Sequence, residues 1–147
     1  MSSAAYKLFF TPPAYKSSTK KLTEPFAPEM YAVFLQLEFL SPKALASGFS
    51  TPTGGPPIET VEWAKRVLLR VLPRKYLIGA HVSAFEREIH ASWENDDNGK
   101  RVVVFFPAPG ELKIYHEWVR DNKVVEHELL NTMSPADISE RLRWFRQ

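Results

Sequence analysis

The feature that most constrains this fold is a change in the spacing of apolar residues near position 82. In residues 58–72, before that position, apolar residues recur every three or four residues, as on one face of a helix, whereas after position 82 they alternate with polar residues. Turn sequences then interrupt the alternation at Asn98-Gly99, at 107–111 and at Asp121-Asn122. Because short turns join antiparallel neighbours, we predict a meander of four antiparallel strands over about residues 82–130.

The Asn98-Gly99 turn sets the register of the first hairpin. Both residues tolerate the positive φ of a two-residue type I′ turn, and such a turn places Trp93 opposite Val104. Ala91 then faces Phe106. The side chains predicted to share the buried face of the meander are Phe85, Ile89, Ala91, Trp93, Val102, Val104, Phe106, Leu112, Ile114, His116 and Trp118.

Two amphipathic segments flank the meander and can cover its apolar face. Residues 58–72 carry apolar side chains at spacings of three and four, and Pro73 ends the pattern. Residues 135–146 follow Ser134, a residue type favoured as a helix N-cap. The apolar stripe of that second segment is Ile138, Leu142 and Phe145. Helix, strands and helix in this order predict an α+β two-layer sandwich.

The first third of the chain has three parts: an arm at 1–28, an apolar element at 30–39 and a linker rich in glycine and proline at 46–57. In the apolar element alternate residues are apolar, which favours an extra strand. A helical face is the alternative, made of Met30, Val33, Phe34 and Leu37. We predict the strand, within a single α+β domain over 29–147.

Composition excludes several classes of protein. A chain of 147 residues buries enough surface for one core that needs neither a metal nor a disulfide. Because the chain has no cysteine, it has no thiol nucleophile and no thiolate metal site, and we predict a cytoplasmic protein without a cofactor. The longest apolar run, at 30–35, is too short to cross a membrane. The net charge of +2 does not by itself indicate a polyanionic partner.

The segment at 94–99 has part of the spacing of a calcium-binding loop. Asp96, Asn98 and Gly99 fit the pattern, but Phe105 stands where a bidentate glutamate is needed. A loop that continues directly into an apolar strand cannot wrap around an ion. We therefore predict a hairpin turn at this segment.

A row of Glu86, Glu88 and His90 alternates along one predicted strand, so the three side chains project from one face. Carboxylate and imidazole groups two residues apart can bind a metal. A solvated strand face gives the same pattern, and no second row matches it. We therefore predict that this row is simply exposed to solvent.

A pair of histidines is the most specific candidate for chemistry. If Asp121 and Asn122 are the central residues of a type I′ turn, His116 lies directly opposite His127. Imidazoles about 5 Å apart on adjacent strands can share a metal ion or a proton. A small metal-dependent enzyme using these two residues is one alternative, and a pair of ordinary core histidines is the other. Because no motif combines a nucleophile, a base and an oxyanion site, we predict that the protein is not an enzyme.

Basic residues gather in and after the first helical segment. Five of them occur in eleven residues with no acidic residue among them: Lys65, Arg66, Arg70, Arg74 and Lys75. Together with the lysines and aromatic residues of the arm, they are typical of a surface that binds nucleic acid. Cations near the C-terminal end of a helix also favour the helix dipole and keep its outer face soluble. A nucleic-acid-binding module that uses the basic helix and the arm is therefore an alternative function.

The N-terminal arm is rich in aromatic residues and proline. Its candidate anchors for a partner protein are Tyr6, Phe9, Phe10 and Tyr15. Aromatic side chains dominate interface hot spots, and prolines lower the entropic cost of ordering an arm. An exposed sheet edge can in addition accept a strand from a partner. Our leading hypothesis is a non-catalytic protein-interaction module, an accessory or antitoxin-like subunit that docks on a larger protein through the arm and the sheet edge.

Overall fold

The structure is a computed structural model that describes residues 28–40 and 55–147. Strands β3 to β7 form one antiparallel sheet of five strands in chain order. The α+β class is confirmed, but the sheet has one strand more than the four predicted. The elements in chain order are α2 (Pro28–Phe39), α4 (Ile58–Arg66), the π-helical turn η2 (Val67–Val71), the 3₁₀ turn η3 (Arg74–Leu77), β3 (His81–Phe85), β4 (Glu88–Asn95), β5 (Lys100–Phe106), β6 (Leu112–Arg120), β7 (Lys123–Thr132) and α5 (Ala136–Phe145).

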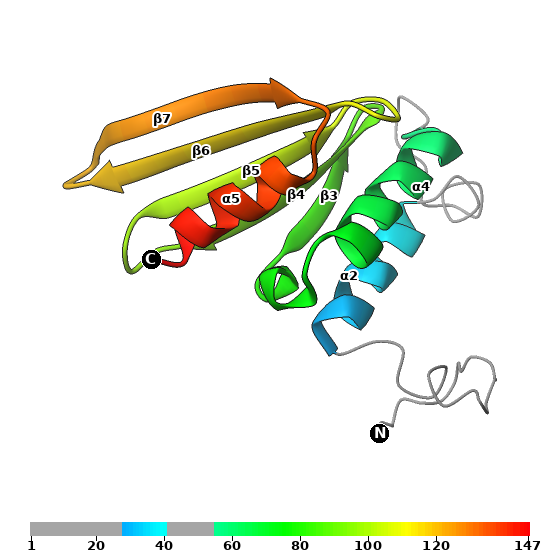
Figure 1. Cartoon of the computed structure of the whole chain (residues 1–147), viewed down its shortest axis with the longest axis horizontal. Helices are drawn as coiled ribbons and strands as arrows, with labels where there is room; N and C mark the ends of the chain where they lie inside the picture. The colour runs from blue at the N-terminus through cyan, green and yellow to red at the C-terminus, as the bar shows by residue number, and fades with distance from the viewer. Residues whose placement is uncertain (1–27, 41–54) are drawn as a thin grey trace.

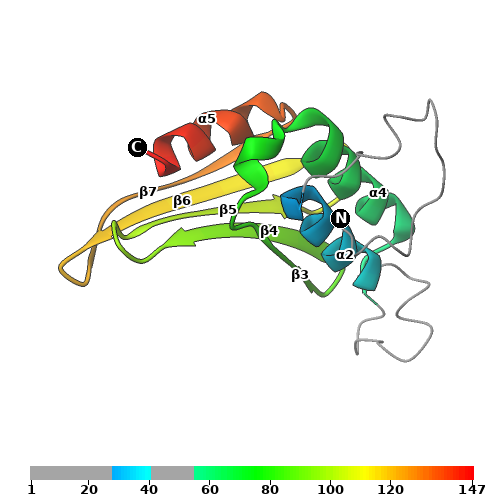
Figure 2. The same cartoon turned by 90° about the horizontal axis from the view of Figure 1, so that it is seen from below.

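The core lies between the sheet and the helices, as Figures 1 and 2 show. The buried side chains of the sheet are Val82, Ile89, Ala91, Trp93, Val102, Val104, Phe106, Leu112, Ile114 and His116. Helices α4 and α5 contribute Val61, Ala64, Ile138, Leu142 and Phe145. The predicted buried face is therefore confirmed at most of its positions. The predicted two-layer arrangement is matched only in part, because α2 packs beside β3 and η3.

The additional strand arises from a hairpin whose turn has no glycine or asparagine. Glu86 and Arg87 join β3 to β4, and Glu86 has a φ of 57°. Two-residue hairpin turns usually place glycine, asparagine or aspartate at such a position. The hairpin puts Phe85 at its end with 64% of its surface exposed, so the predicted burial of Phe85 is wrong. Val82 is the buried residue of β3 instead.

Residues 30–39 belong to helix α2, so the predicted strand is wrong and the helical alternative is correct. Val33 and Leu37 lie one helical turn apart and are buried, whereas Leu35 and Phe39 are exposed. The alternation was misleading because α2 carries apolar side chains on more than one side. Packing against β3 and η3 selects the helix over the strand.

The helix predicted at 58–72 is present as α4 followed by η2. Leu72 adopts an extended ψ of 133°, which ends the helix directly before Pro73. A residue that precedes proline is driven out of the helical region by the proline ring, so this end follows from the sequence. The helical prediction and its proline stop are both confirmed.

The C-terminal helix predicted at 135–146 is α5, but its predicted cap is wrong. No side chain caps the first turn. Instead, Thr132 Oγ1 donates to Asp137 Oδ2 at 2.6 Å and accepts a hydrogen bond from the Ser134 amide at 3.0 Å. A residue at the end of β7 therefore fixes the start of the helix.

The loop between β4 and β5 is longer than the predicted two-residue turn. Asn95 pairs with Lys100, which leaves four residues in the loop, 96–99. Trp93 consequently faces Val102 rather than Val104. The predicted register is wrong by two residues, but a shift of two keeps every side chain on its own face. The predicted buried face therefore survives the error in register.

Oxygen atoms of this loop bind the backbone of the loop itself. Asn95 Oδ1 accepts hydrogen bonds from the amides of Asp97 at 2.9 Å and Asn98 at 3.4 Å. Gly99 has a φ of 77°, and its carbonyl accepts a hydrogen bond from the Val119 amide at 2.9 Å. The segment is therefore a hairpin turn, as predicted, and it also contacts the end of β6.

Candidate interaction edge

β7 is the outer strand of the sheet and is accessible along its whole length. It has ten residues, none of which is buried. Val124, Val125 and Leu129 are 52%, 53% and 55% exposed. In Figure 1 β7 lies at the margin of the sheet, with β6 on one side and no other described element beyond it. In the described part of the chain, its outward amides and carbonyls are thus open to another strand.

The opposite edge of the sheet is covered. β3 has only five residues, and α2 packs beside it. The backbone amide of Val82 donates a hydrogen bond of 2.6 Å to Gln36 Oε1 of α2. This bond satisfies an outward donor that a pairing strand would otherwise use.

A bulge in β7 decides which of its side chains face the helices. At the hairpin tip the turn is as predicted, with Asp121 and Asn122 at φ values of 52° and 63°. Between Trp118 and Val119, however, the pairing with β7 shifts by one residue, which leaves Val125 as an extra residue. A shift by one moves every following side chain to the other face of the sheet.

The predicted pairing of His116 with His127 is therefore wrong. His116 faces Glu128, and His127 faces Glu117. Successive positions of a strand point to opposite faces, so the two imidazoles lie on opposite sides of the sheet and cannot share one ion. Over residues 28–40 and 55–147, no three histidine, cysteine or acidic side chains are grouped so that they could hold a metal.

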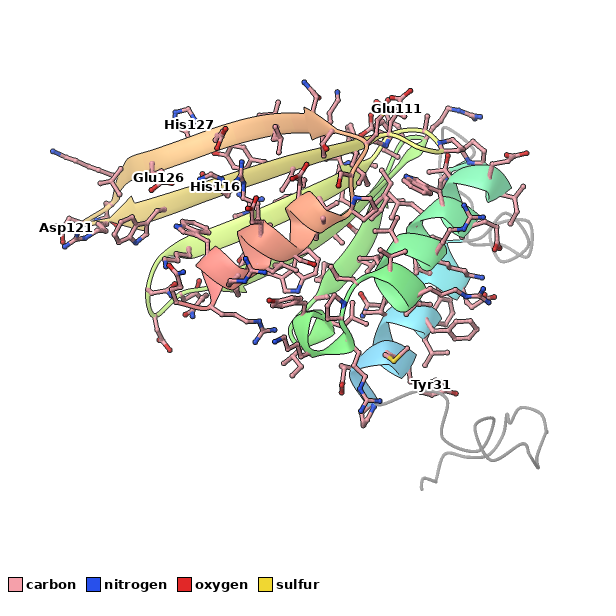
Figure 3. The ribbon with its side chains drawn as sticks, in the orientation of Figure 1. Tyr31, Glu111, His116, Asp121, Glu126 and His127 are labelled. Atoms are coloured by element: carbon pink, nitrogen blue, oxygen red, sulfur yellow. The ribbon has the colours of Figure 1, made fainter. Side chains whose placement is uncertain are left out.

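His116 belongs to a polar cluster between β6, β7 and α5. Its Nε2 lies 3.0 Å from Glu126 Oε2, and its ring centre lies 4.6 Å from that of Trp144. Figure 3 shows His116 and Glu126 beside each other between the two strands, with Asp121 at the hairpin tip. The histidine is 4% exposed, and its Nδ1 has no hydrogen-bond partner among the described residues.

A second acidic side chain of β7 is held in the same way. Arg141 of α5 donates from Nη2 to Glu128 Oε1 at 2.8 Å. The side chains of Glu126 and Glu128 remain 48% and 55% exposed. The helix side of β7 thus presents two fixed carboxylates two residues apart, which we call the acidic edge.

The position of His116 relative to the surface cavities bears on the enzyme alternative. Two surface cavities have volumes of about 430 and 240 Å³, and His116 lines neither of them. The larger one lies between the β4–β5 loop and the end of α5, and Asp96, Asp97 and Arg146 are among its lining residues. A general base must reach the proton that it removes, and the described contacts of the His116 ring are with Glu126 and Trp144.

The predicted row of Glu86, Glu88 and His90 is interrupted by the first hairpin. Glu86 lies in the turn, while His90 Nε2 is 3.4 Å from Glu88 Oε1. The His90 ring makes an edge contact with Phe105, with ring centres 4.6 Å apart. The histidine is therefore held by an aromatic and an acidic neighbour on the face away from the core.

Tyr115 lies on that same face. Its hydroxyl donates a hydrogen bond of 2.7 Å to Glu117 Oε1. This bond, together with burial and the negative charge of Glu117, raises the pKa of Tyr115 above its ordinary value of 10.0. The neutral tyrosine is thus the form that the folded protein favours.

The predicted basic surface is only partly free. Lys65 is hydrogen-bonded to Glu38 of α2 and lies 3.7 Å from Glu62. The other predicted residues are all exposed: Arg66, Arg70, Arg74 and Lys75. The structure therefore brings four of the five basic residues to the surface and ties the fifth to acidic neighbours.

The predicted partner anchors lie outside the described residues: Tyr6, Phe9, Phe10 and Tyr15. Sequence reasoning missed the acidic edge and its partner Arg141. The alternation of Glu126 and Glu128 with apolar residues was visible, but the predicted register placed these glutamates on the face away from the helices. Only the bulge turns them toward α5.

None of the helices that the structure describes is long and apolar enough to cross a membrane. Comparison of the chain with protein-family models, curated proteins and solved structures finds no match. A proposal about function therefore has to come from the geometry of the β7 edge.

Proposed function

We propose that the protein is a non-catalytic interaction module, an accessory subunit that binds a larger protein by accepting a strand along β7. The exposure of β7 carries this proposal, because eight of its ten residues are exposed and none is buried. A long edge with exposed apolar side chains is a template for another strand, and soluble proteins usually cover such an edge. Strand addition at an open edge is a common mode of peptide recognition.

The N-terminal arm provides a second contact in this proposal. Its aromatic residues act as anchors that fill pockets of the partner. Deletion of residues 1–25 should leave a cooperative thermal transition, because the described core draws on residues from Val33 to Phe145. Partner binding should weaken in the same variant. Loss of the transition would show that the arm is part of the core.

A double variant on β7 and a single control variant on β3 test the role of β7. Val125→Lys combined with Leu129→Lys replaces two exposed apolar side chains of the open edge. Phe85→Lys is the matched control, because Phe85 is also exposed but lies on β3. Proteins that the immobilised chain retains from a native extract are quantified by mass spectrometry. A partner of β7 should be retained by the wild type and the control and lost from the double variant, whereas equal retention by all three would exclude the proposal.

The exposed arginines support a nucleic-acid-binding module as the second candidate. Arg66, Arg70 and Arg74 are exposed at spacings of four residues. Reversal of all three charges should weaken binding of a nucleic acid and flatten its dependence on salt, because fewer counterions are released. Absence of a gel shift with the wild type at low ionic strength would remove this candidate.

A further inference from the structure

The two sides of β7 differ in chemistry. On the side that faces α5, Glu126 and Glu128 stand two residues apart. On the other side, His127 and Leu129 follow the extra residue Val125 at the bulge. A strand added to β7 would meet acidic groups on one of its faces and mainly apolar groups on the other.

The two carboxylates are already oriented by the domain. Glu126 is held through Oε2 by His116, and Glu128 is held through Oε1 by Arg141. Each carboxylate keeps a second oxygen that can accept a hydrogen bond from a cation. Because the side chains are fixed before binding, a partner loses less entropy in pairing with them.

We propose that the strand accepted by β7 is a basic one, an extended segment of a partner protein in which lysine or arginine alternates with apolar residues. This inference rests on the proposed strand-accepting function and names the chemistry of its partner. Alternate side chains of a strand are about 7 Å apart, so two cations of such a segment stand opposite Glu126 and Glu128. Opposite charges that face each other across strands stabilise the pair, and the apolar residues between them cover Val125 and Leu129.

A second copy of this chain fits the edge less well in the registers that bring the glutamates of the two copies together. Two β7 strands related by a twofold axis pair antiparallel, so side chains of the same face must meet. A pair centred on His127 sets Glu126 against Glu128 of the second copy. A pair centred on Glu128 sets that residue against its own equivalent. Like charges directly opposite one another destabilise a pair of strands.

Binding of blocked synthetic peptides to the full chain tests the inference. The first peptide alternates lysine and valine, the second alternates glutamate and valine, and the third is the lysine peptide with every backbone amide methylated. Fluorescence anisotropy measures their affinities at moderate salt. The lysine peptide should bind about tenfold or more tightly than the glutamate peptide. The methylated peptide should not bind, because it cannot donate the backbone hydrogen bonds of a strand pair. Attraction between charges alone would not be affected by the methylation.

Variants of the chain connect this preference to the acidic edge. Glu126→Lys with Glu128→Lys should reverse the preference between the first two peptides. Glu126→Gln with Glu128→Gln keeps side chains that can bond to His116 and Arg141, and should remove the preference even if the lysine variant fails to fold. Glu59→Lys with Glu140→Lys is the control, since both residues are exposed and lie on helices. The control should bind the lysine peptide with at least half of the wild-type affinity.

The outcomes separate the inference from the proposed function. Equal binding of the lysine and glutamate peptides would contradict the inference that the accepted strand is basic. It would leave the proposed strand-accepting function intact. Binding of the methylated peptide would overturn both, because the contact would not be strand pairing. A dimer of the wild-type chain that Val125→Lys with Leu129→Lys dissociates would overturn the inference in favour of a second copy.

Discussion

The two edges of the sheet differ, because the β3 edge is covered and the β7 edge is open. β3 is a five-residue strand beside α2, and its outward Val82 amide is satisfied by Gln36. β7 is twice as long, and the described part of the chain places no element along its outer side. Three exposed apolar side chains lie on β7, namely Val124, Val125 and Leu129, whereas β3 exposes Phe85 at its end.

The difference shows that the open edge is not a general property of this sheet. At β3 the edge is covered by helix α2, whose Gln36 side chain accepts a hydrogen bond from the strand backbone. β7 instead carries a bulge and two glutamates on its helix side, and in our proposal these glutamates disfavour an acidic strand and favour a basic one. One edge is closed within the domain, whereas the other is open and, in our proposal, selects a basic strand.

The largest expected effect is at Gly99, whose loop is bonded to the hairpin that carries the open edge. A Cβ at this position would overlap the carbonyl oxygen of Val119, and the φ of +77° is unfavourable for other residues. Gly99→Ala should therefore lower the free energy of unfolding by about 3 kcal/mol or more in urea titration. Gly110→Ala is the control, because its φ is +85° but nothing lies within 4 Å, and about 1 to 2 kcal/mol is expected. Equal losses would contradict the contact with Val119.

The next effect distinguishes the two faces of the open edge. His116 is buried against Trp144 and bonded to Glu126, so His116→Ala should lower the free energy of unfolding by about 2 to 3 kcal/mol. His127 is exposed, and His127→Ala should change it by less than about 0.5 kcal/mol. Thermal and urea unfolding of both variants measure the difference. Similar effects would mean that the bulge is absent and that both histidines share a face.

A smaller effect is expected when the covered edge is opened. Gln36→Ala removes the acceptor of the Val82 amide and should cost about 1 to 2 kcal/mol. Hydrogen exchange at that amide should become faster in the same variant. Gln36→Glu keeps an acceptor oxygen and serves as the control. Unchanged exchange in Gln36→Ala would show that α2 does not protect β3 through this bond.

The smallest effect concerns Tyr115, on the strand next to the open edge. The folded protein holds the tyrosine proton more tightly than the unfolded chain does, because the hydroxyl donates to Glu117. The resulting stability is complete below about pH 10 and is lost as the pH rises through the raised pKa. Above that pH the melting temperature of the wild type should fall more steeply than that of Tyr115→Phe. Parallel curves would show that the bond does not persist in solution.

Much of the fold could be predicted because its signals are local. Apolar spacing and Pro73 indicated the helix at 58–72, and spacing alone indicated the helix at 135–146. Alternation indicated the buried face of the sheet, and it tolerated a register error of two residues at the β4–β5 loop. The predicted pair of histidines was lost to a register error of one residue in β7, because that shift places His127 on the opposite face of the sheet from His116.

The sequence by itself determined the α+β class, the two amphipathic helices and the side of the sheet that is buried, since these depend on periods that each segment carries within itself. The tertiary structure decided three features. Residues 30–39 fit two periods until packing against β3 selects the helix. The turn at Glu86 has no local signal, and it forms because the strands on either side of it pair. The bulge of β7 places Glu126 and Glu128 against His116 and Arg141, which come from other elements, so the acidic edge exists only in the folded chain.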